Sequence, residues 1–203
     1  MRSFGGVCLS RLSSISFNIQ TSPAESSVNL ILNFLYSFFF GSPLEKTTID
    51  PLDTSGSLHD RLAGMGGNLV LTTMEGMLNG QLTPKPQDHS KATYAPMLKK
   101  ADGHIDWSLP VSHIFCLMRG VTPWPGAFTF HNDMRLKIHR AHPILEPVSE
   151  PPGTVLKTFP GELRISTGNG VLQVLEIQGA SGKRLAVQDF LRGYRLDPGE
   201  RLS

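Results

Sequence analysis

The feature that most limits how this chain can fold is a change of hydrophobic period after residue 126. Apolar residues then recur at every second position, as in Phe128 and Phe130 and again in Leu136 and Ile138, with a turn at 131–133 between the pairs. This alternation is typical of half-buried strands joined in a hairpin. Five or six such segments, bounded by glycines, lie close together. We therefore expect a small closed or half-closed β-barrel.

Two helical patterns and a linker precede these strands. A stripe of apolar residues at spacings of four, three and four predicts a helix capped by Asp53 or Thr54: Leu58, Leu62, Met65 and Leu69. Residues 44–49 before it have the composition of one short strand. A second helical pattern covers 108–119, and the polar, Pro-broken stretch between the two bodies predicts a linker over 81–106.

Residues 1–43 differ in composition from the rest of the chain, since residues 1–44 hold ten serines and a single acid. We expect this leader to be divergent and disordered. Its apolar run 28–40 is shorter than the roughly 20 residues that a membrane span needs, so no membrane partner is expected. Cytoplasmic localisation is the first expectation. A mitochondrial location is the alternative, because an Arg/Ser-rich, acid-poor start is typical of transit peptides.

Known catalytic and metal-binding motifs are missing from the sequence. It contains no phosphate-binding Gly-x-x-x-x-Gly-Lys, no Gly-x-Gly-x-x-Gly, no His-Glu-x-x-His and no Cys-x-x-Cys. The two cysteines, Cys8 and Cys116, are too few for a disulfide framework or a thiolate zinc site. We therefore expect no metal.

The basic residues are more informative. Residues 107–203 carry eleven bases and eight acids, against eight bases and nine acids in residues 1–106. Arg135, Lys137 and His139 alternate along one segment, so they share a face if it is a strand. A basic face of this kind is typical of a nucleic-acid platform, and a merely solvated strand face is the equal alternative. The candidate phosphate contacts are Arg135, Lys137, Arg140, Lys183 and Arg184.

From Leu44 onward the chain resembles the later part of the methionyl-tRNA formyltransferase family. Four stretches carry the likeness, with GKRL (182–185) before the last: DTSGSLHDRLAGMGG (53–67), ATYAPMLKKADGHIDWSLP (92–110), RGVTPWPGAF (119–128) and DFLRGYRLDPGE (189–200). The resemblance implies transfer of a formyl group from 10-formyltetrahydrofolate to methionyl initiator tRNA in translation initiation. It further implies that 44–80 is the remnant of a Rossmann-like catalytic domain, 81–106 a linker and 107–203 an OB-like barrel that helps to hold tRNA.

The catalytic residues of that family have no counterpart in this sequence. The family uses an Asn-x-His pair and a later Asp, whereas no asparagine here has a histidine two positions on, and Asp53 belongs to a helix start. We therefore expect a fragment with no catalytic residue and no bound 10-formyltetrahydrofolate, and whether the chain is an enzyme stays open. Its expected partner is methionyl initiator tRNA, with no DNA.

Two other functions remain open at this point. The chain can be an active formyltransferase whose catalytic half is supplied by another chain, or the barrel module of another folate-dependent formyltransferase. Trp124 and Phe128 can stack on a base, although core packing is the stronger expectation. For Arg119, pairing with a carboxylate between the domains is expected as strongly as a contact with tRNA.

Overall fold

The computed structural model describes residues 18–21, 27–31, 44–82, 96–156 and 161–203. The chain divides into two compact units, Met1–Leu98 and Lys99–Ser203. Each is described by itself. None of the helices in the described parts combines the length and the apolar character needed to cross a bilayer.

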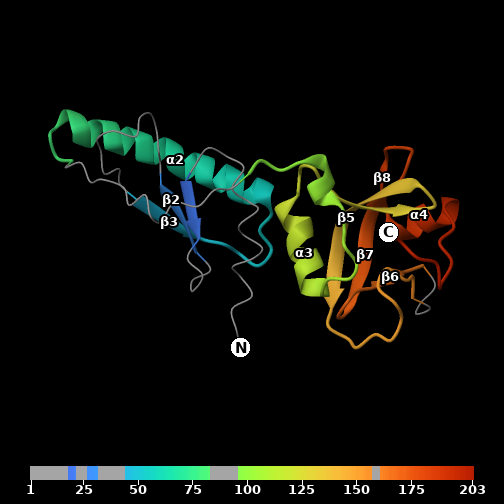
Figure 1. The fold of residues 1–203 in the computed structure, drawn as a ribbon. Helices are drawn as coiled ribbons and strands as arrows, with labels where there is room; N and C mark the ends of the chain where they lie inside the picture. Colours follow the sequence, from blue (N-terminus) through green and yellow to red (C-terminus); the bar gives the residue numbers. More distant parts are fainter. Residues whose placement is uncertain (1–17, 22–26, 32–43, 83–95, 157–160) are drawn as a thin grey trace. The chain divides into compact units, whose positions relative to one another are not determined.

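Within its described residues, the first unit has a three-stranded antiparallel sheet and one long helix (Figure 1). Its strands are β1 (Asn18–Thr21), β2 (Ser27–Ile31) and β3 (Leu44–Thr48), in the order β1-β2-β3. The strand expected at 44–49 is therefore present. Strands β1 and β2 are the described segments of the leader. The rest of the leader, and residues 83–95 of the expected linker, lie outside the described residues.

Helix α2 (Ser55–Leu78) begins where the sequence predicts. The hydroxyl of Thr54 accepts a hydrogen bond from the Ser57 amide (3.1 Å), and the Ser57 hydroxyl accepts one from the Thr54 amide (3.0 Å). This reciprocal pair is a capping box, which satisfies two amides at the helix start. The helix buries Leu58, Leu62 and Leu69, as their spacing predicts.

An ion pair connects the start of α2 to the end of β3. The Arg61 guanidinium donates to both carboxylate oxygens of Asp53, at 2.5 and 3.2 Å, and to the carbonyl of Thr48 at 2.9 Å. The hydrogen bond from Arg61 is the largest cause that lowers the pKa of Asp53 from its ordinary value of 3.8. A carboxyl with a lowered folded-state pKa stabilises the fold above its ordinary pKa, and this stabilisation disappears as the pH falls through the lowered value.

We predict that Arg61→Gln destabilises the first unit at neutral pH more than in acid. At about pH 7 the ionised Asp53 loses its partner, whereas toward about pH 2 protonation of Asp53 increasingly removes the same ion pair from the wild type. Thermal unfolding followed by circular dichroism at the two pH values measures this difference. Arg192→Gln, which removes an exposed pair with Asp189, is the charge-matched control. An equal effect of Arg61→Gln at both pH values would contradict the prediction.

The second unit is built on a five-stranded antiparallel sheet. Its strands are β4 (Ala127–His131), β5 (Met134–Ile144), β6 (Leu163–Ser166), β7 (Val171–Gln178) and β8 (Arg184–Ala186). The order is β4-β5-β7-β6, and β8 also pairs with β7. The predicted β4–β5 hairpin is confirmed. Its turn places Asn132 and Asp133 at φ of 46° and 63°, the left-handed conformation that a tight two-residue hairpin turn requires.

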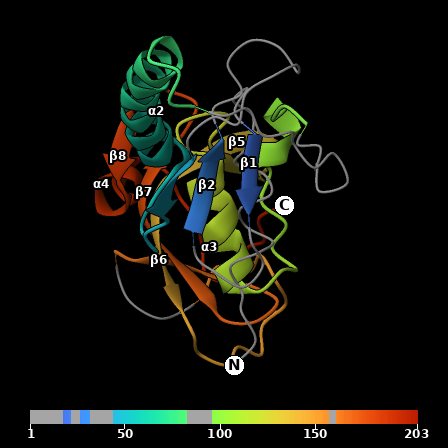
Figure 2. The same ribbon diagram turned by 90° about the vertical axis from the view of Figure 1, so that its left-hand side faces the viewer.

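The remaining elements of this unit are helical. They are the 3₁₀ helix η2 (Lys100–Gly103), α3 (Val111–Gly120) and α4 (Val187–Gly193). Helix α3 buries Val111, Ile114 and Met118 against β5 and β7 (Figure 2), which agrees with the helix expected over 108–119.

Of the closed or half-closed barrel expected from the sequence, the closed form is not made by these strands, because the sheet is open, with β4 and β6 at its ends. Two irregular segments, 153–156 and 199–203, lie between the ends. Residues 153–156 bond to β6, as in the bond from the Leu156 amide to the Arg164 carbonyl (2.9 Å). In the other segment Ser203 exchanges two backbone bonds with Phe130 of β4, at 2.7 and 3.0 Å. The left-handed φ values of Gly153 and Gly199, 85° and 93°, interrupt extended backbone there.

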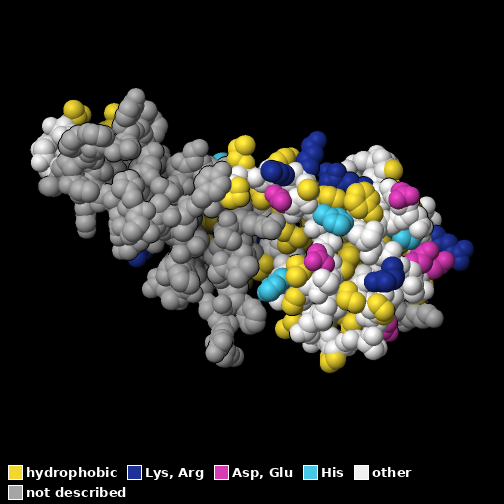
Figure 3. Space-filling model, in the orientation of Figure 1, with side chains coloured by type: hydrophobic (Ala, Val, Ile, Leu, Met, Phe, Trp, Pro, Cys, Tyr) yellow, Lys and Arg dark blue, Asp and Glu magenta, His cyan; other side chains and the backbone are white. Residues whose placement is uncertain are grey.

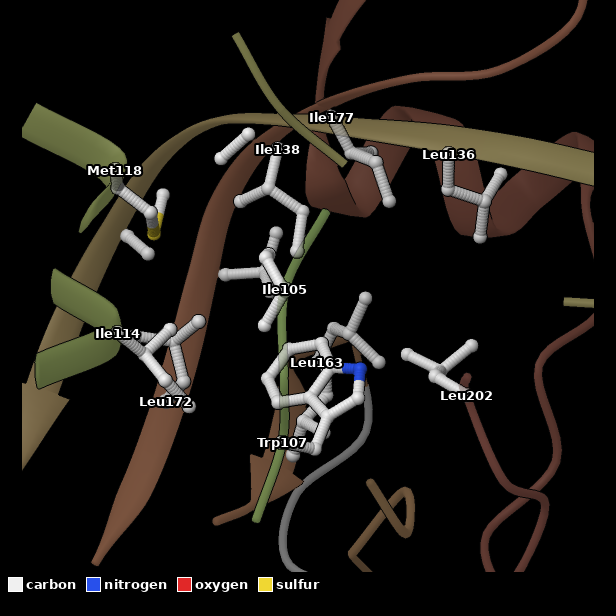
Figure 4. Close-up of a cluster of buried hydrophobic side chains, with 14 of the residues drawn as sticks. Ile105, Trp107, Ile114, Met118, Leu136, Ile138, Leu163, Leu172, Ile177 and Leu202 are labelled. Carbon is white, nitrogen blue, oxygen red and sulfur yellow. The ribbon is translucent and has the colours of Figure 1, made fainter. Parts of the chain in front are cut away.

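The core of the second unit lies between α3 and the sheet (Figure 4). Leu136, Ile165 and Leu172 are completely inaccessible to solvent. Trp107 is also buried, and its indole N–H donates to the Thr129 hydroxyl at 2.9 Å. That hydroxyl donates in turn to the Ser203 carbonyl at 2.9 Å, so one side chain connects the tryptophan to the end of the chain.

We predict that Thr129→Val destabilises the second unit by about 1–3 kcal/mol, because the indole N–H of Trp107 loses its buried acceptor. Thr129→Ser keeps the hydroxyl and serves as the matched control, with a smaller loss. Urea unfolding followed by tryptophan fluorescence measures both variants. Equal stabilities of the two variants would show that the hydroxyl contributes little.

Candidate nucleic-acid interface

The outer face of strand β5 carries the basic side chains that the sequence singled out. Leu136 and Ile138 are buried on the core side, while Arg135 and Lys137 alternate with them on the opposite side. In the hairpin Lys137 lies across from Phe128, and Arg135 across from Phe130. The structure therefore agrees with the expectation that Arg135 and Lys137 share one face.

Arg135 is packed on aromatic rings. Its guanidinium carbon lies 3.8 Å from the centroid of the Phe128 ring, a cation–π contact. Phe128 also contacts Phe130 edge-on at 5.6 Å, and the His104 ring at 5.3 Å. Only 7% of Phe128 is exposed, so this ring supports Arg135 and has little area to offer a base. Trp124 differs, since it is 53% exposed.

Arg140 and Arg184 share one carboxylate. Glu176 lies on β7, and its Oε1 accepts from Arg140 at 2.9 Å while its Oε2 accepts from Arg184 at 2.5 Å. The structure thus brings together two candidates that are far apart in sequence, across three neighbouring strands. It also places an acid between them, which sequence reasoning missed because the contact depends on the register of β5, β7 and β8.

Among the described residues no carboxylate pairs with Arg135, Lys137 or Lys183, and of these three only Arg135 is packed on an aromatic ring. Lys183 is exposed, next to the start of β8, and Lys137 is half-buried on β5. On the face that Figure 3 shows, lysine and arginine side chains lie in several places, separated by apolar and acidic groups. The basic surface is therefore dispersed.

Arg119 contacts two side chains of its own helix. Its guanidinium carbon lies 5.4 Å from the Phe115 ring centroid, and Nη2 donates to the Cys116 sulfur at 3.3 Å. These contacts lie within helix α3.

Sequence reasoning also missed a cluster around a buried histidine. His131 is 4% exposed, and its Nδ1 lies 2.7 Å from the Tyr194 hydroxyl while its Nε2 lies 3.3 Å from a carboxylate oxygen of Glu200. Burial, and then the nearby charge of Glu200, raise the pKa of Tyr194. The three residues come from separate segments, and no local motif marks them. The cluster connects β4 to the residues after α4.

In the described parts of the chain, no group of three or more His, Cys, Asp or Glu side chains is arranged to hold a metal ion. Basic side chains lie on the β4–β5 hairpin and on β8, and one of them, Arg135, packs on the Phe128 ring.

Residues 97–195 match the family model described as formyl transferase, C-terminal domain. This match places the larger part of the second unit in that class of domain.

The chain is also similar to proteins named methionyl-tRNA formyltransferase, which confirms the resemblance seen in the sequence. It is 43% identical over 155 residues to the one from Syntrophus aciditrophicus, covering 76% of this chain and 50% of that protein. It is 40% identical over 161 residues to the one from Heliobacterium modesticaldum, covering 75% and 51%. The chain spans about half the length of the curated relatives it matches.

Two solved structures share the fold at low sequence identity. HypX from Aquifex aeolicus, solved in complex with tetrahydrofolic acid, has a TM-score of 0.60 at 17% identity and covers 86% of this chain and 32% of HypX. The N-formyltransferase from Helicobacter canadensis, with folinic acid and dTDP-3-aminofucose, has a TM-score of 0.51 at 15% identity, covering 76% and 56%. At these identities the likeness concerns the fold alone.

We predict that Tyr194→Phe destabilises the second unit by about 1–2 kcal/mol, since it leaves a nitrogen of the buried His131 without its partner. The ring and its contact with Phe190 are kept, so the change isolates the hydroxyl. Urea unfolding measures the loss. Unchanged stability would mean that water replaces the hydroxyl.

Proposed function

We propose that this chain is the tRNA-holding part of a methionyl-tRNA formyltransferase and that it does not catalyse formyl transfer by itself. The observation that carries the proposal is the similarity, at about 40% identity, to proteins of that name. In this proposal the second unit, with an OB-like character, binds methionyl initiator tRNA. Residues 44–80 are the remnant of the Rossmann-like domain, and 81–106 connect the two. The cytoplasm is the proposed location, and the mitochondrion is the alternative.

Contacts to phosphates are the proposed mode of binding. Lysine and arginine neutralise backbone phosphates and release counterions, without reading the bases. Lys137 is the leading contact because no carboxylate among the described residues pairs with it. Arg135 presents a guanidinium already held on Phe128, which lowers the entropy lost on binding. Arg140, Lys183 and Arg184 extend the surface across β5 and β8.

Catalysis is proposed to depend on residues outside this sequence. Formyl transfer needs a deprotonated amine and donors preorganised around the developing oxyanion. The family's Asn-x-His pair is absent here. We accordingly propose that the chain alone neither binds 10-formyltetrahydrofolate productively nor transfers its formyl group. Incubating the purified chain with methionyl initiator tRNA and excess 10-formyltetrahydrofolate tests this, and product above the protein-free control would overturn it.

An active enzyme whose catalytic half is supplied by another chain is the second candidate. A protein that carries the Asn-x-His pair and the later Asp, supplied in trans, restores transfer if this candidate is right.

We predict that Lys137→Ala and Arg140→Ala each weaken binding of the chain to initiator tRNA. Each also lowers the slope of log K against log salt by about one, because one phosphate contact is lost. Fluorescence anisotropy with labelled tRNA over a salt series measures both quantities. Arg192→Ala, on the exposed face of α4, is the control and should leave the slope unchanged. Unchanged affinity at low salt would remove Lys137 and Arg140 from the interface.

A further inference from the structure

Glu176 is an acid in the middle of the proposed phosphate-binding surface. It lies on β7, where it is opposite Arg140 of β5 on one side and Ala186 of β8 on the other. Each carboxylate oxygen accepts from a different guanidinium, Oε1 from Arg140 and Oε2 from Arg184. The two arginines are therefore held on one anion by the register of three strands.

The exposure of the three side chains shows that this cluster faces solvent. Arg140 is 64% exposed and Arg184 is 55% exposed, whereas Glu176 is 23% exposed beneath them. A guanidinium has five N–H donors, so each arginine keeps donors beyond those used on Glu176. The cluster carries a formal charge of +1, from two cations and one anion.

The arrangement has the chemistry of an occupied anion site. Two guanidiniums, each directed at a separate oxygen of one carboxylate, are also placed to bind two oxygens of a phosphodiester. Exposed ion pairs of this kind contribute only about 0–1 kcal/mol each, because water competes for the charges. A phosphate can therefore replace the carboxylate at low cost, provided that other contacts hold the ligand in place.

We propose that Glu176 sets the selectivity of the RNA interface by competing, as an internal anion, for Arg140 and Arg184. The inference rests on the proposed function, since it concerns the same surface. A correctly shaped RNA, positioned by contacts such as Lys137, displaces the carboxylate and gains both arginines. An RNA that lacks those contacts does not displace the carboxylate, so Arg140 and Arg184 stay paired with Glu176 and attract its phosphates less. The carboxylate thus weakens binding of the wrong RNA more than binding of the right one.

Glu176→Gln tests this proposal, because it keeps the shape of the side chain and both arginines but removes the internal anion. Its matched control is Asp189→Asn, which removes one negative charge and releases the exposed Arg192 on α4. Anisotropy over a salt series, with initiator tRNA and with a single-stranded RNA of the same length, gives affinities and salt slopes. Urea unfolding checks that the variants fold.

We expect Glu176→Gln to raise affinity for the single-stranded RNA about tenfold, and affinity for tRNA by a smaller factor. The slope of log K against log salt for the single-stranded RNA should steepen by about 1.4, or about 0.7 for each released arginine. Adding Arg140→Ala and Arg184→Ala to Glu176→Gln should abolish the gain, while Asp189→Asn should change the tRNA preference little.

Several results separate this inference from the proposed function. If the wild type binds tRNA but Glu176→Gln behaves like Asp189→Asn, the inference is wrong and the proposed function stands. If Glu176→Gln weakens tRNA binding, the carboxylate organises the arginines, and the competition proposed here is wrong. If the wild type binds no tRNA but Glu176→Gln binds RNA, the proposed function fails and the internal anion is supported. If neither protein binds RNA, both proposals fail.

Discussion

The pairing of β7 with its neighbours is the constraint on which the second unit depends. This strand pairs with β5, β6 and β8, so it sets the register of most of the sheet. Because side chains alternate between the two faces of a strand, the register that buries Leu136 and Ile138 of β5 also turns Arg135 and Lys137 outward. A shift of one residue would exchange the two faces. The core and the basic surface are thus determined by the same hydrogen bonds.

The basic surface is less positive than the count of lysines and arginines indicates. Arg140 and Arg184 share Glu176, and Arg135 is packed on Phe128. Of the candidate contacts, only Lys137 and Lys183 have no such partner among the described residues. Net charge alone is therefore a poor measure of how many cationic groups this surface leaves available, because one carboxylate, Glu176, pairs with two arginines.

The end of the chain is held by polar contacts. Ser203 pairs with Phe130 through the backbone and accepts from Thr129, while His131 contacts Tyr194 and Glu200. These contacts bring residues from the far end of the sequence onto β4. These contacts join β4, a strand at the end of the open sheet, to the irregular backbone that follows α4.

Much of the local structure could be predicted because it depends on neighbours in sequence. Thr54 and Ser57 are three residues apart and form the capping box, and Asn132–Asp133 is a turn suited to a tight hairpin. The alternation of Arg135 and Lys137 with Leu136 and Ile138 assigned them to opposite faces of a strand. The family resemblance likewise depended on residues in linear order.

Whether the sheet closes into a barrel, and which groups pair with the basic residues, could not be predicted from neighbours in sequence. Whether a sheet closes depends on how its two edges meet, and here glycines at 153 and 199 leave irregular backbone between them. The contact of Glu176 with Arg140 and Arg184, and that of His131 with Tyr194, join segments that are distant in sequence. The sequence by itself determined the elements, the faces of the strands and the family resemblance, since these depend on local periodicity and motifs. Only the tertiary structure decided which charges meet, because strand register brings them together.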